Sequence, residues 1–423
     1  MQRTLKEKGG KMFKFKMFVM LMFSLMVVLL SIKHSSATSQ WARKFEMSCN
    51  SCHAAFPRLN YFGEQFMRNG YQIPGTQDGD MKKKSVGDRL VIDQLQNLLG
   101  IRLNLTPIAV KTKDLTVDEE KKTSINMGNA NWLQLFTGGS IYKNTSVLIE
   151  TELAAVSVKN NWFRLGFHNM AGPEGAANLH IGQLSPMEWH AISGRVRMIA
   201  PVSIQTISGV KSSEDKGEDS VPLASAVPGI SFYGYQGPVL YSVGISNGKT
   251  ATDPNQYKNY FATIRYDIQS GDLMGSALSI WGMSGSDTKD SDTKDTSTSQ
   301  KKNNFWRASP AVNIRHHQLD ILAGYFFGRD DNWTLVAASP IENEFSGLIL
   351  QTGYPFSQSI YGALQYDYVD SDDSSINFNK ITPSVSFFPK DNMRIYLTAR
   401  VDLRDATDYD KQHELLITLR TMF

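Results

Sequence analysis

Alternation of apolar and polar residues over strand-length segments is the feature that most constrains the fold of this 423-residue chain. Between residues 393 and 404, every second residue is apolar, from Met393 to Leu403. The intervening residues include Arg394, Arg400 and Asp402. A period of two places the two classes on opposite faces of a strand, whereas a helix would mix them. Similar segments of about ten residues recur from about residue 88 onward, without the apolar run of about 18 residues that a membrane-spanning helix needs. The chain is therefore predicted to be mainly β.

The charges on the polar faces favour one β architecture over another. Glu150 and Glu152 alternate with Ile149 and Thr151, so one face of that strand is acidic. A packed interior would have to pair many such charges, whereas the wet lumen of a barrel accepts them. We predict an outer-membrane antiparallel β-barrel of about 16 strands, with about 14 or 18 as alternatives. Residues 172–193 hold one strand or two, and a soluble β-sandwich is the alternative fold.

The predicted connections alternate between tight turns and long polar loops, which is typical of outer-membrane barrels. The tight turns are expected at Lys143-Asn144, Ser270–Asp272, Arg315–Gln318, Pro355–Ser357 and Pro389–Asp391. The long loops are expected at Lys211–Ser220, Ser284–Asn304, Asp370–Ser375 and Asp405–Gln412. The last strand ends on Phe423, and a terminal aromatic residue resembles the assembly signal of such barrels.

The N-terminus predicts export. Several lysines between Lys6 and Lys16 precede an apolar run from Met17 to Ile32, and Ser35-Ser36-Ala37 then offers a cleavage site. This order is that of a secretory signal peptide over residues 1–37. A retained membrane anchor is the alternative, although the run is slightly shorter than a span of about 20 residues.

The two cysteines of the sequence stand in the run Cys49-Asn50-Ser51-Cys52-His53. Two thiols at this spacing can add to the two vinyl groups of a haem, and the adjacent imidazole can bind its iron. We therefore predict one c-type haem, held covalently by Cys49 and Cys52 and ligated by His53. A structural disulfide and a dithiol redox centre are the alternatives. A closed zinc site is disfavoured because no second cluster of Cys or His lies nearby.

A helix is expected after this motif, with Pro57 at its first position and Gly70 at its end. Leu59, Phe62 and Phe66 recur on one face, which we expect to lie against the porphyrin or to pack as an ordinary core face. The haem segment, residues 38–87, is too short to enclose a macrocycle unaided. We expect it to plug the lumen of the barrel formed by residues 88–423.

The second axial ligand of the iron is left open. Met67 and Met81 are candidates that would raise the redox potential. His168, His180 or His190 of the barrel could serve instead. A packing role is the favoured interpretation of Met67 itself.

The residues around the motif resemble the fused monohaem cytochrome c-porin family of outer-membrane iron oxidases. The resemblance is carried by Phe45, Cys49–His53, Phe56-Pro57-Arg58-Leu59, Phe62-Gly63, Phe66 and Gly70-Tyr71. It extends over the rest of the chain only through the order of its parts. It implies oxidation of extracellular Fe(II), with the electron passing through the haem to a periplasmic c-type cytochrome.

Other function classes are disfavoured or stay open. Lys and Arg number 44 against 41 Asp and Glu, without a basic stretch, so no nucleic-acid partner is expected. No nucleophile or phosphate-binding motif is found. Acidic pairs such as Asp330-Asp331 and Asp370 with Asp372 could bind iron, but solvated loop charge is the favoured interpretation. A conduit for another electron donor or acceptor, or a haem-containing porin, is the alternative function.

Overall fold

The computed structural model describes residues 39–76, 84–85, 91–92, 97–114, 121–154, 157–193, 197–199, 226–248, 257–288, 302–333, 341–404 and 411–423. The predicted signal peptide lies outside the described residues, and so do both predicted domain boundaries, near residues 37 and 87. Among the described residues, no helix has the length and apolar character needed to cross a membrane.

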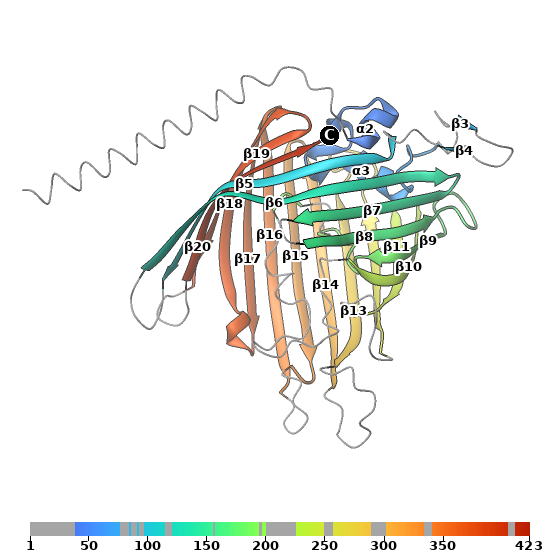
Figure 1. The fold of residues 1–423 in the computed structure, drawn as a ribbon. Helices are drawn as coiled ribbons and strands as arrows, with labels where there is room; N and C mark the ends of the chain where they lie inside the picture. Colours follow the sequence, from blue (N-terminus) through green and yellow to red (C-terminus); the bar gives the residue numbers. More distant parts are fainter. Residues whose placement is uncertain are drawn as a thin grey trace, which may run out of the picture. The chain divides into compact units, whose positions relative to one another are not determined.

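A closed antiparallel barrel of 16 strands forms most of the described chain (Figure 1). The first eight strands are β5 (Leu99–Asp114), β6 (Lys121–Tyr142), β7 (Thr145–Ala154), β8 (Ser157–Phe167), β9 (Asn178–Leu184), β10 (Val227–Gln236), β11 (Val239–Ser246) and β12 (Asn259–Asp267). The other eight are β13 (Ala277–Thr288), β14 (Lys302–His316), β15 (Leu319–Asp330), β16 (Asn343–Ser357), β17 (Ile360–Ser371), β18 (Phe378–Lys390), β19 (Met393–Asp402) and β20 (Lys411–Met422). Each strand pairs with its neighbours in sequence, and β20 closes the barrel against β5. The predicted barrel and its strand number are confirmed.

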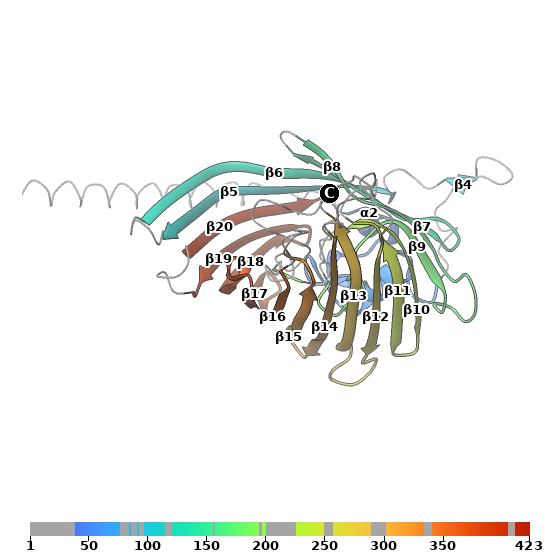
Figure 2. The same ribbon diagram turned by 90° about the horizontal axis from the view of Figure 1, so that it is seen from below.

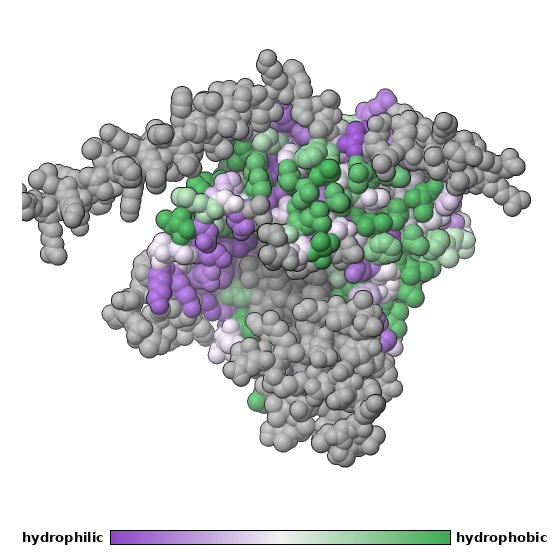
Figure 3. Space-filling view, viewed as in Figure 1, coloured by the Kyte–Doolittle hydropathy of each residue, from purple (hydrophilic) through white to green (hydrophobic). Residues whose placement is uncertain are grey.

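Polar side chains face inward in this barrel and apolar side chains face outward. In β12, Arg265 is 3% exposed, whereas the preceding Ile264 is 66% exposed. Across the β12–β13 ladder, Ile264 lies opposite Ile280, which is 67% exposed. Figure 3 shows apolar residues gathered on the outer face of the strands in this view. A water-soluble protein has the reverse arrangement, because apolar surface gains free energy by leaving water.

The short connections lie together at one end of the barrel. They include the predicted turn Lys143-Asn144, together with His317-Gln318 and Asp391-Asn392. The turn predicted at Pro355–Ser357 is wrong in position, because β16 continues through Ser357 and the chain turns at Gln358-Ser359. Of the long loops, residues 211–220 and most of 284–304 and 405–412 lie outside the described residues.

The connection after β9 folds into the barrel. The stretch from residue 172 to 193 holds one strand, β9, and residues 185–193 are all buried. Met187 and Ile192 belong to the same apolar cluster as Trp281, an inward-facing residue of β13. The Trp281 indole N–H also donates to the carbonyl of Pro186 (2.9 Å). This buried stretch therefore serves as an internal partner for the barrel wall rather than as a second strand.

The N-terminal segment, residues 39–76, packs against inward-facing barrel residues. It contains α2 (Gln40–Phe45), η1 (Cys49–Ser51), β1 (His53–Ala55), β2 (Arg58–Leu59) and α3 (Tyr61–Arg68). The indole N–H of Trp41 donates to the Gly138 carbonyl of β6 (3.0 Å), and the Tyr233 hydroxyl of β10 donates to the Arg68 carbonyl (2.9 Å). In both ribbon views α2 lies close to the C-terminus (Figures 1 and 2). The remaining short elements are β3 (Lys84–Ser85), β4 (Val91–Ile92) and η4 (Ser374–Ile376).

The outward position of Ile264 allows a test of whether lipid or water surrounds the barrel. If lipid surrounds the strands, Ile264→Arg should lower the free energy of unfolding from phospholipid vesicles by up to about 4 kcal/mol. The matched variant Ile264→Val should change it by less than about 1.5 kcal/mol. Urea titration of vesicle-inserted protein, followed by tryptophan fluorescence, measures both. Equal stability of the two variants would contradict a lipid-facing surface.

Candidate functional site

The Cys49–His53 motif forms a tight turn that leads directly into a strand. The Cys52 N–H donates to the Cys49 carbonyl (3.2 Å), which closes the 3-10 turn, and His53 opens β1. Both cysteines are free and half-buried. Burial raises the pKa of the Cys49 and Cys52 thiols to about 11. A dithiol redox centre usually has a lowered thiol pKa, and burial shifts the pKa of these two thiols in the opposite direction.

Asn60 ties the motif to helix α3. Its side chain caps the helix by accepting from the Gly63 N–H (2.9 Å) and donates to the Ser51 carbonyl (3.0 Å). Its backbone N–H donates to the Cys52 carbonyl (2.9 Å). The helix therefore begins at Tyr61, and the predicted start at Pro57 is wrong, because Pro57 lies in the turn between β1 and β2. Asn before a helical run is a common N-cap, and this signal was missed.

Two glycines allow α3 to approach its neighbours closely. A Cβ at Gly63 would overlap the Cys52 carbonyl, so the helix reaches the motif only because residue 63 has no side chain. Gly70, near the predicted helix end, has φ +66° and lies against the imidazole of His168. The contact through Gly63 holds the motif at a fixed place relative to the helix.

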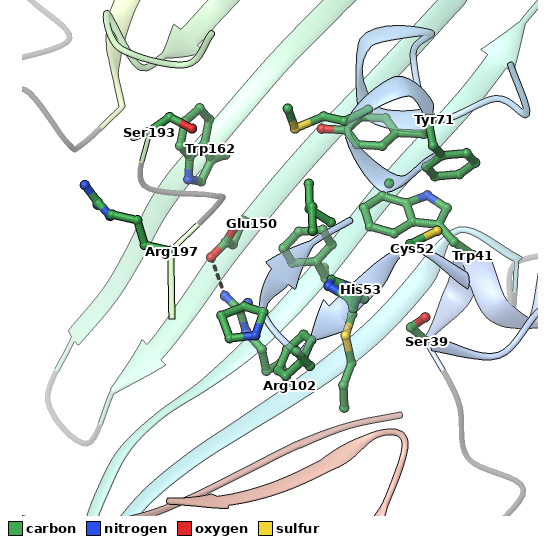
Figure 4. Close-up of a pocket in the computed structure, with 18 of the residues that line it drawn as sticks. Ser39, Trp41, Cys52, His53, Tyr71, Arg102, Glu150, Trp162, Ser193 and Arg197 are labelled. Carbon is green, nitrogen blue, oxygen red and sulfur yellow. Dashed lines mark hydrogen bonds and ion pairs between the residues drawn. The ribbon is translucent and has the colours of Figure 1, made fainter. Parts of the chain in front are cut away.

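Cys52 and His53 line a cavity of about 400 Å³ between the N-terminal segment and the barrel wall. Its aromatic lining consists of Trp41, Phe56, Phe66, Tyr71, Phe136 and Trp162. Trp41 and Tyr71 stack with ring centroids 4.7 Å apart. Figure 4 shows Cys52, His53 and Trp41 on the side of the N-terminal segment, with Arg102 and Glu150 on the barrel side. Arg102 and Glu150 form an ion pair with an N–O distance of 2.9 Å. Cys49 lines a small adjoining cavity that Cys52 and His53 share.

The donor groups of this cavity fit a c-type haem. Burial lowers the pKa of His53 to about 4, with the carbonyls of Pro57 and Arg58 acting in the opposite direction, so the imidazole is neutral, as a metal ligand must be. Its buried Nδ1 has no hydrogen-bond partner among the described residues. Arg197 is buried at the same cavity with its Nε also unpartnered there. Guanidinium groups suit carboxylates such as haem propionates.

The candidate second ligands of the iron differ in whether they line the cavity and in whether their donor atoms already have hydrogen-bond partners. Met67 is buried and lines the cavity with His53. Both ring nitrogens of His168 are hydrogen-bonded, one with the Ser146 hydroxyl (2.7 Å) and the other with the Tyr233 hydroxyl (3.1 Å). His190 likewise contacts the Ser309 and Ser279 hydroxyls (3.1 and 2.8 Å).

His180 stacks on Trp189, with ring centroids 5.9 Å apart. None of the three barrel histidines lines the cavity, and Met81 lies outside the described residues. Among the candidates that the structure describes, Met67 lines the cavity with His53 and the three histidines do not. Leu59, Phe62 and Phe66 do pack in one apolar cluster, although Leu59 belongs to β2 rather than to the helix.

Glu64 of α3 is the centre of a buried ion network that joins the N-terminal segment to the barrel. Glu64 is 1% exposed, and its carboxylate forms ion pairs with Arg315 of β14 (2.5 Å) and with Arg265 of β12. Arg68 and Arg58 of the segment lie 3.8 and 3.9 Å away. We call Glu64, its four arginines and the two partners Asp267 and Asp320 the Glu64 network. Arg68 pairs with Asp267 (2.5 Å) and Arg58 with Asp320 (2.6 Å).

The electrostatics of this network keep Glu64 ionised. Burial alone would raise the pKa of its carboxyl, but the surrounding guanidinium groups, led by Arg265 and Arg315, outweigh burial and hold the pKa well below its usual range. Each charge thus offsets the desolvation of another, and removal of one leaves the others unpaired in a dry site. The network had no signal in the sequence, because its members are scattered along the chain.

Comparisons with known proteins identify the fold. The chain matches no protein-family model and no curated protein. Among solved structures, an anion-selective porin from Comamonas acidovorans is similar, with a TM-score of 0.55, 12% identity, and coverage of 77% of this chain and 99% of the porin. The outer-membrane channel DcaP of Acinetobacter baumannii gives a TM-score of 0.49 at 11% identity, and the match covers 77% of this chain and 97% of the channel. The barrel is thus of the porin type.

The close approach at Gly63 predicts the effect of one added methyl group. Gly63→Ala should push α3 away from the Cys52 carbonyl and lower the local opening free energy of α3 by about 1–3 kcal/mol. Hydrogen exchange of the α3 amides measures this loss. Gly282→Ala is the matched control, because the nearest atom to its added Cβ lies at an ordinary 3.7 Å. Unchanged exchange in Gly63→Ala would contradict the packing described.

The lowered pKa of Glu64 predicts how docking depends on pH. A carboxyl whose pKa is lower in the folded state stabilises that state fully above its ordinary value of 4.5 and loses this contribution as the pH falls towards the lowered value. Exchange protection of α3 should therefore be constant from neutral pH to about 5 and should fall below about 4.5.

Glu64→Gln should reduce this protection at neutral pH by about 3–5 kcal/mol, because four guanidinium groups lose their shared partner. It should also reduce the pH dependence in the acidic range, since only Asp267 and Asp320 of the network then remain to be protonated. The exposed Glu174→Gln is the control and should keep both properties. A wild-type pH profile in Glu64→Gln would show that another group governs docking.

Proposed function

We propose that this chain is an outer-membrane electron-transfer protein that takes electrons from extracellular Fe(II) and passes them to a periplasmic c-type cytochrome. The observation that carries the proposal is the position of Cys49, Cys52 and His53 at an aromatic-lined cavity within a porin-type barrel. In this proposal Cys49 and Cys52 hold one haem through thioether bonds, and His53 is its axial ligand. The bound haem supplies reversible one-electron chemistry.

The barrel's outward apolar face supports placement in the outer membrane. Lipid would contact side chains such as Ile264 and Ile280, and the charged lumen would be screened from the acyl chains. The short turns of such barrels face the periplasm. The motif lies near this end, since the Asn50 side chain donates to Asp391 in the β18–β19 turn (3.4 Å). A periplasmic acceptor would therefore approach the motif from the short-turn side.

The cavity has an apolar side and a side that carries charged groups. Trp41, Phe66 and Tyr71 form the apolar side, while Arg197, whose Nε has no hydrogen-bond partner among the described residues, offers positive charge for carboxylates of the bound group. Met67 offers a thioether sulfur as a second ligand, and ligation by Met raises the potential of a c-type centre. A raised potential suits acceptance of electrons from Fe(II).

The acidic residues that could bind iron have partners within the described part of the protein. Asp330 is buried and pairs with Arg307 (2.9 Å), and Asp372 accepts from the Glu344 N–H (2.9 Å). Residues 405–410, with their three aspartates, lie outside the described residues. The donor is therefore proposed from the resemblance of the motif region, without an assigned docking site.

A haem-containing porin is the second candidate, and the porin-type fold favours it. The N-terminal segment and residues 185–193 both occupy space against the inner wall, which reduces the room for solute passage. Conductance in planar bilayers separates the two functions. High conductance that persists without the haem would favour the porin.

The proposal predicts a covalent haem that Fe(II) reduces. Purified protein should retain haem on a denaturing gel, and stopped-flow mixing with Fe(II) should convert its absorption spectrum to the reduced form. Cys52→Ala should lose a tether and His53→Ala the ligand, so both should mature poorly. Ile264→Val, a change on the outer face of β12 and outside both cavities, is the control. Haem that acid acetone extracts, or a haem that Fe(II) does not reduce, would contradict the proposal.

A further inference from the structure

A second cluster of metal-ligating side chains lies on the short turns, apart from the haem cavity. Asp272 stands in the β12–β13 connection, and His316 and His317 stand at the β14–β15 turn. One ligand atom from each of the three residues lies within 4.8 Å of the others, and all three residues are exposed. None of them lines the cavity that contains His53. The cluster is therefore accessible from solvent and separate from the site already described.

The two turns are held together by hydrogen bonds, so the cluster does not depend on chance contact between loops. The Arg315 N–H donates to the Ser276 hydroxyl (2.8 Å), which in turn lies 3.2 Å from the Arg315 carbonyl. The Arg315 guanidinium donates to the Gly275 carbonyl (3.0 Å). These bonds fix the residue before His316 against the end of the connection that carries Asp272. A site built on cross-linked turns loses less conformational entropy on binding a ligand.

The backbone of each turn also favours this arrangement. The Gly275 N–H donates to the Ile268 carbonyl (2.7 Å), which closes the β12–β13 connection on itself. Gly271, next to Asp272, has φ +74° and His317 has φ +53°. The left-handed conformation at His317 brings its ring beside that of His316, with centroids 4.2 Å apart. Two imidazoles from adjacent residues therefore project to the same side as the carboxylate.

We propose that Asp272, His316 and His317 bind a divalent transition-metal ion such as Zn²⁺ or Cu²⁺. Imidazole nitrogen suits these ions, whereas Ca²⁺ and Mg²⁺ select oxygen ligands. Three protein ligands leave at least one position for water or for an outside group, as in open zinc sites. The inference rests on this geometry alone and does not require the proposed electron transfer.

The site lies beside the Glu64 network. Arg315, which precedes His316, donates to the Leu59 carbonyl (2.9 Å) and pairs with Glu64 (2.5 Å). A bound cation would therefore sit near the elements that hold the N-terminal segment. The ion would lie at the short-turn end of the barrel, close to the segment that carries the Cys49–His53 motif.

Zn²⁺ binding to the full-length protein in detergent, without a histidine tag, tests the proposal. Titration against a chromophoric chelator should show one site. His316→Asn and His317→Asn should each weaken it by at least about tenfold, since even outer-shell partners cost about 10–100-fold. His413→Asn is the matched control, because His413 lies in β20 outside the cluster, and it should leave binding unchanged. A large excess of Mg²⁺ should not displace Zn²⁺.

Cu²⁺ electron paramagnetic resonance gives a second measurement, which reports the ligand atoms directly on the unaltered protein. Nitrogen hyperfine splitting from the imidazoles is expected, and it should disappear in His316→Asn/His317→Asn. Absence of a site in the wild type, a site with oxygen ligands alone, or unchanged Zn²⁺ affinity in the double variant would overturn the proposal. Loss of the site in His413→Asn would assign it elsewhere.

Discussion

The buried carboxylate of Glu64 is the constraint on which the rest of the site depends. A charge in a dry interior is stable only when opposite charges and hydrogen bonds replace water, and Arg265 and Arg315 of the barrel wall provide this. The same carboxylate is therefore stable only when α3 is docked inside the barrel. Docking of α3 in turn sets the position of the Cys49–His53 motif, because Gly63 lies directly against the Cys52 carbonyl.

The network is possible because the barrel has an inverted polarity. Its strands expose apolar side chains such as Ile264 and bury charged ones such as Arg265. The inner wall therefore offers charged side chains that can form ion pairs with a segment inside the barrel. A segment too short to form its own core can then be held by charge as well as by apolar contact. Trp41 and Phe66 add the apolar part through the cluster that lines the cavity. Wall and segment together enclose a site that neither would form alone.

Local patterns in the sequence predicted the strands, because a period of two depends only on neighbouring residues. The motif was equally local, since Cys49, Cys52 and His53 are adjacent in the chain. The Glu64 network was not predictable in this way, as its wall arginines lie 201 and 251 residues from Glu64. The inward fold of residues 185–193 was missed for a related reason: a short stretch of mixed polarity has no period that separates a strand from a segment packed in a lumen. The helix start was misplaced because the cap, Asn60, decides it rather than Pro57.

Electron transfer across a closed vesicle tests the central claim most directly. Purified protein is inserted into phospholipid vesicles that enclose an oxidised soluble cytochrome c, and a membrane-impermeant Fe(II) chelate is added outside. The account predicts reduction of the enclosed cytochrome in vesicles that contain the protein, and none in vesicles without protein or with the His53→Ala variant. Enclosed cytochrome that stays oxidised, although the haem of the inserted protein is reduced, would contradict a conduit through the barrel.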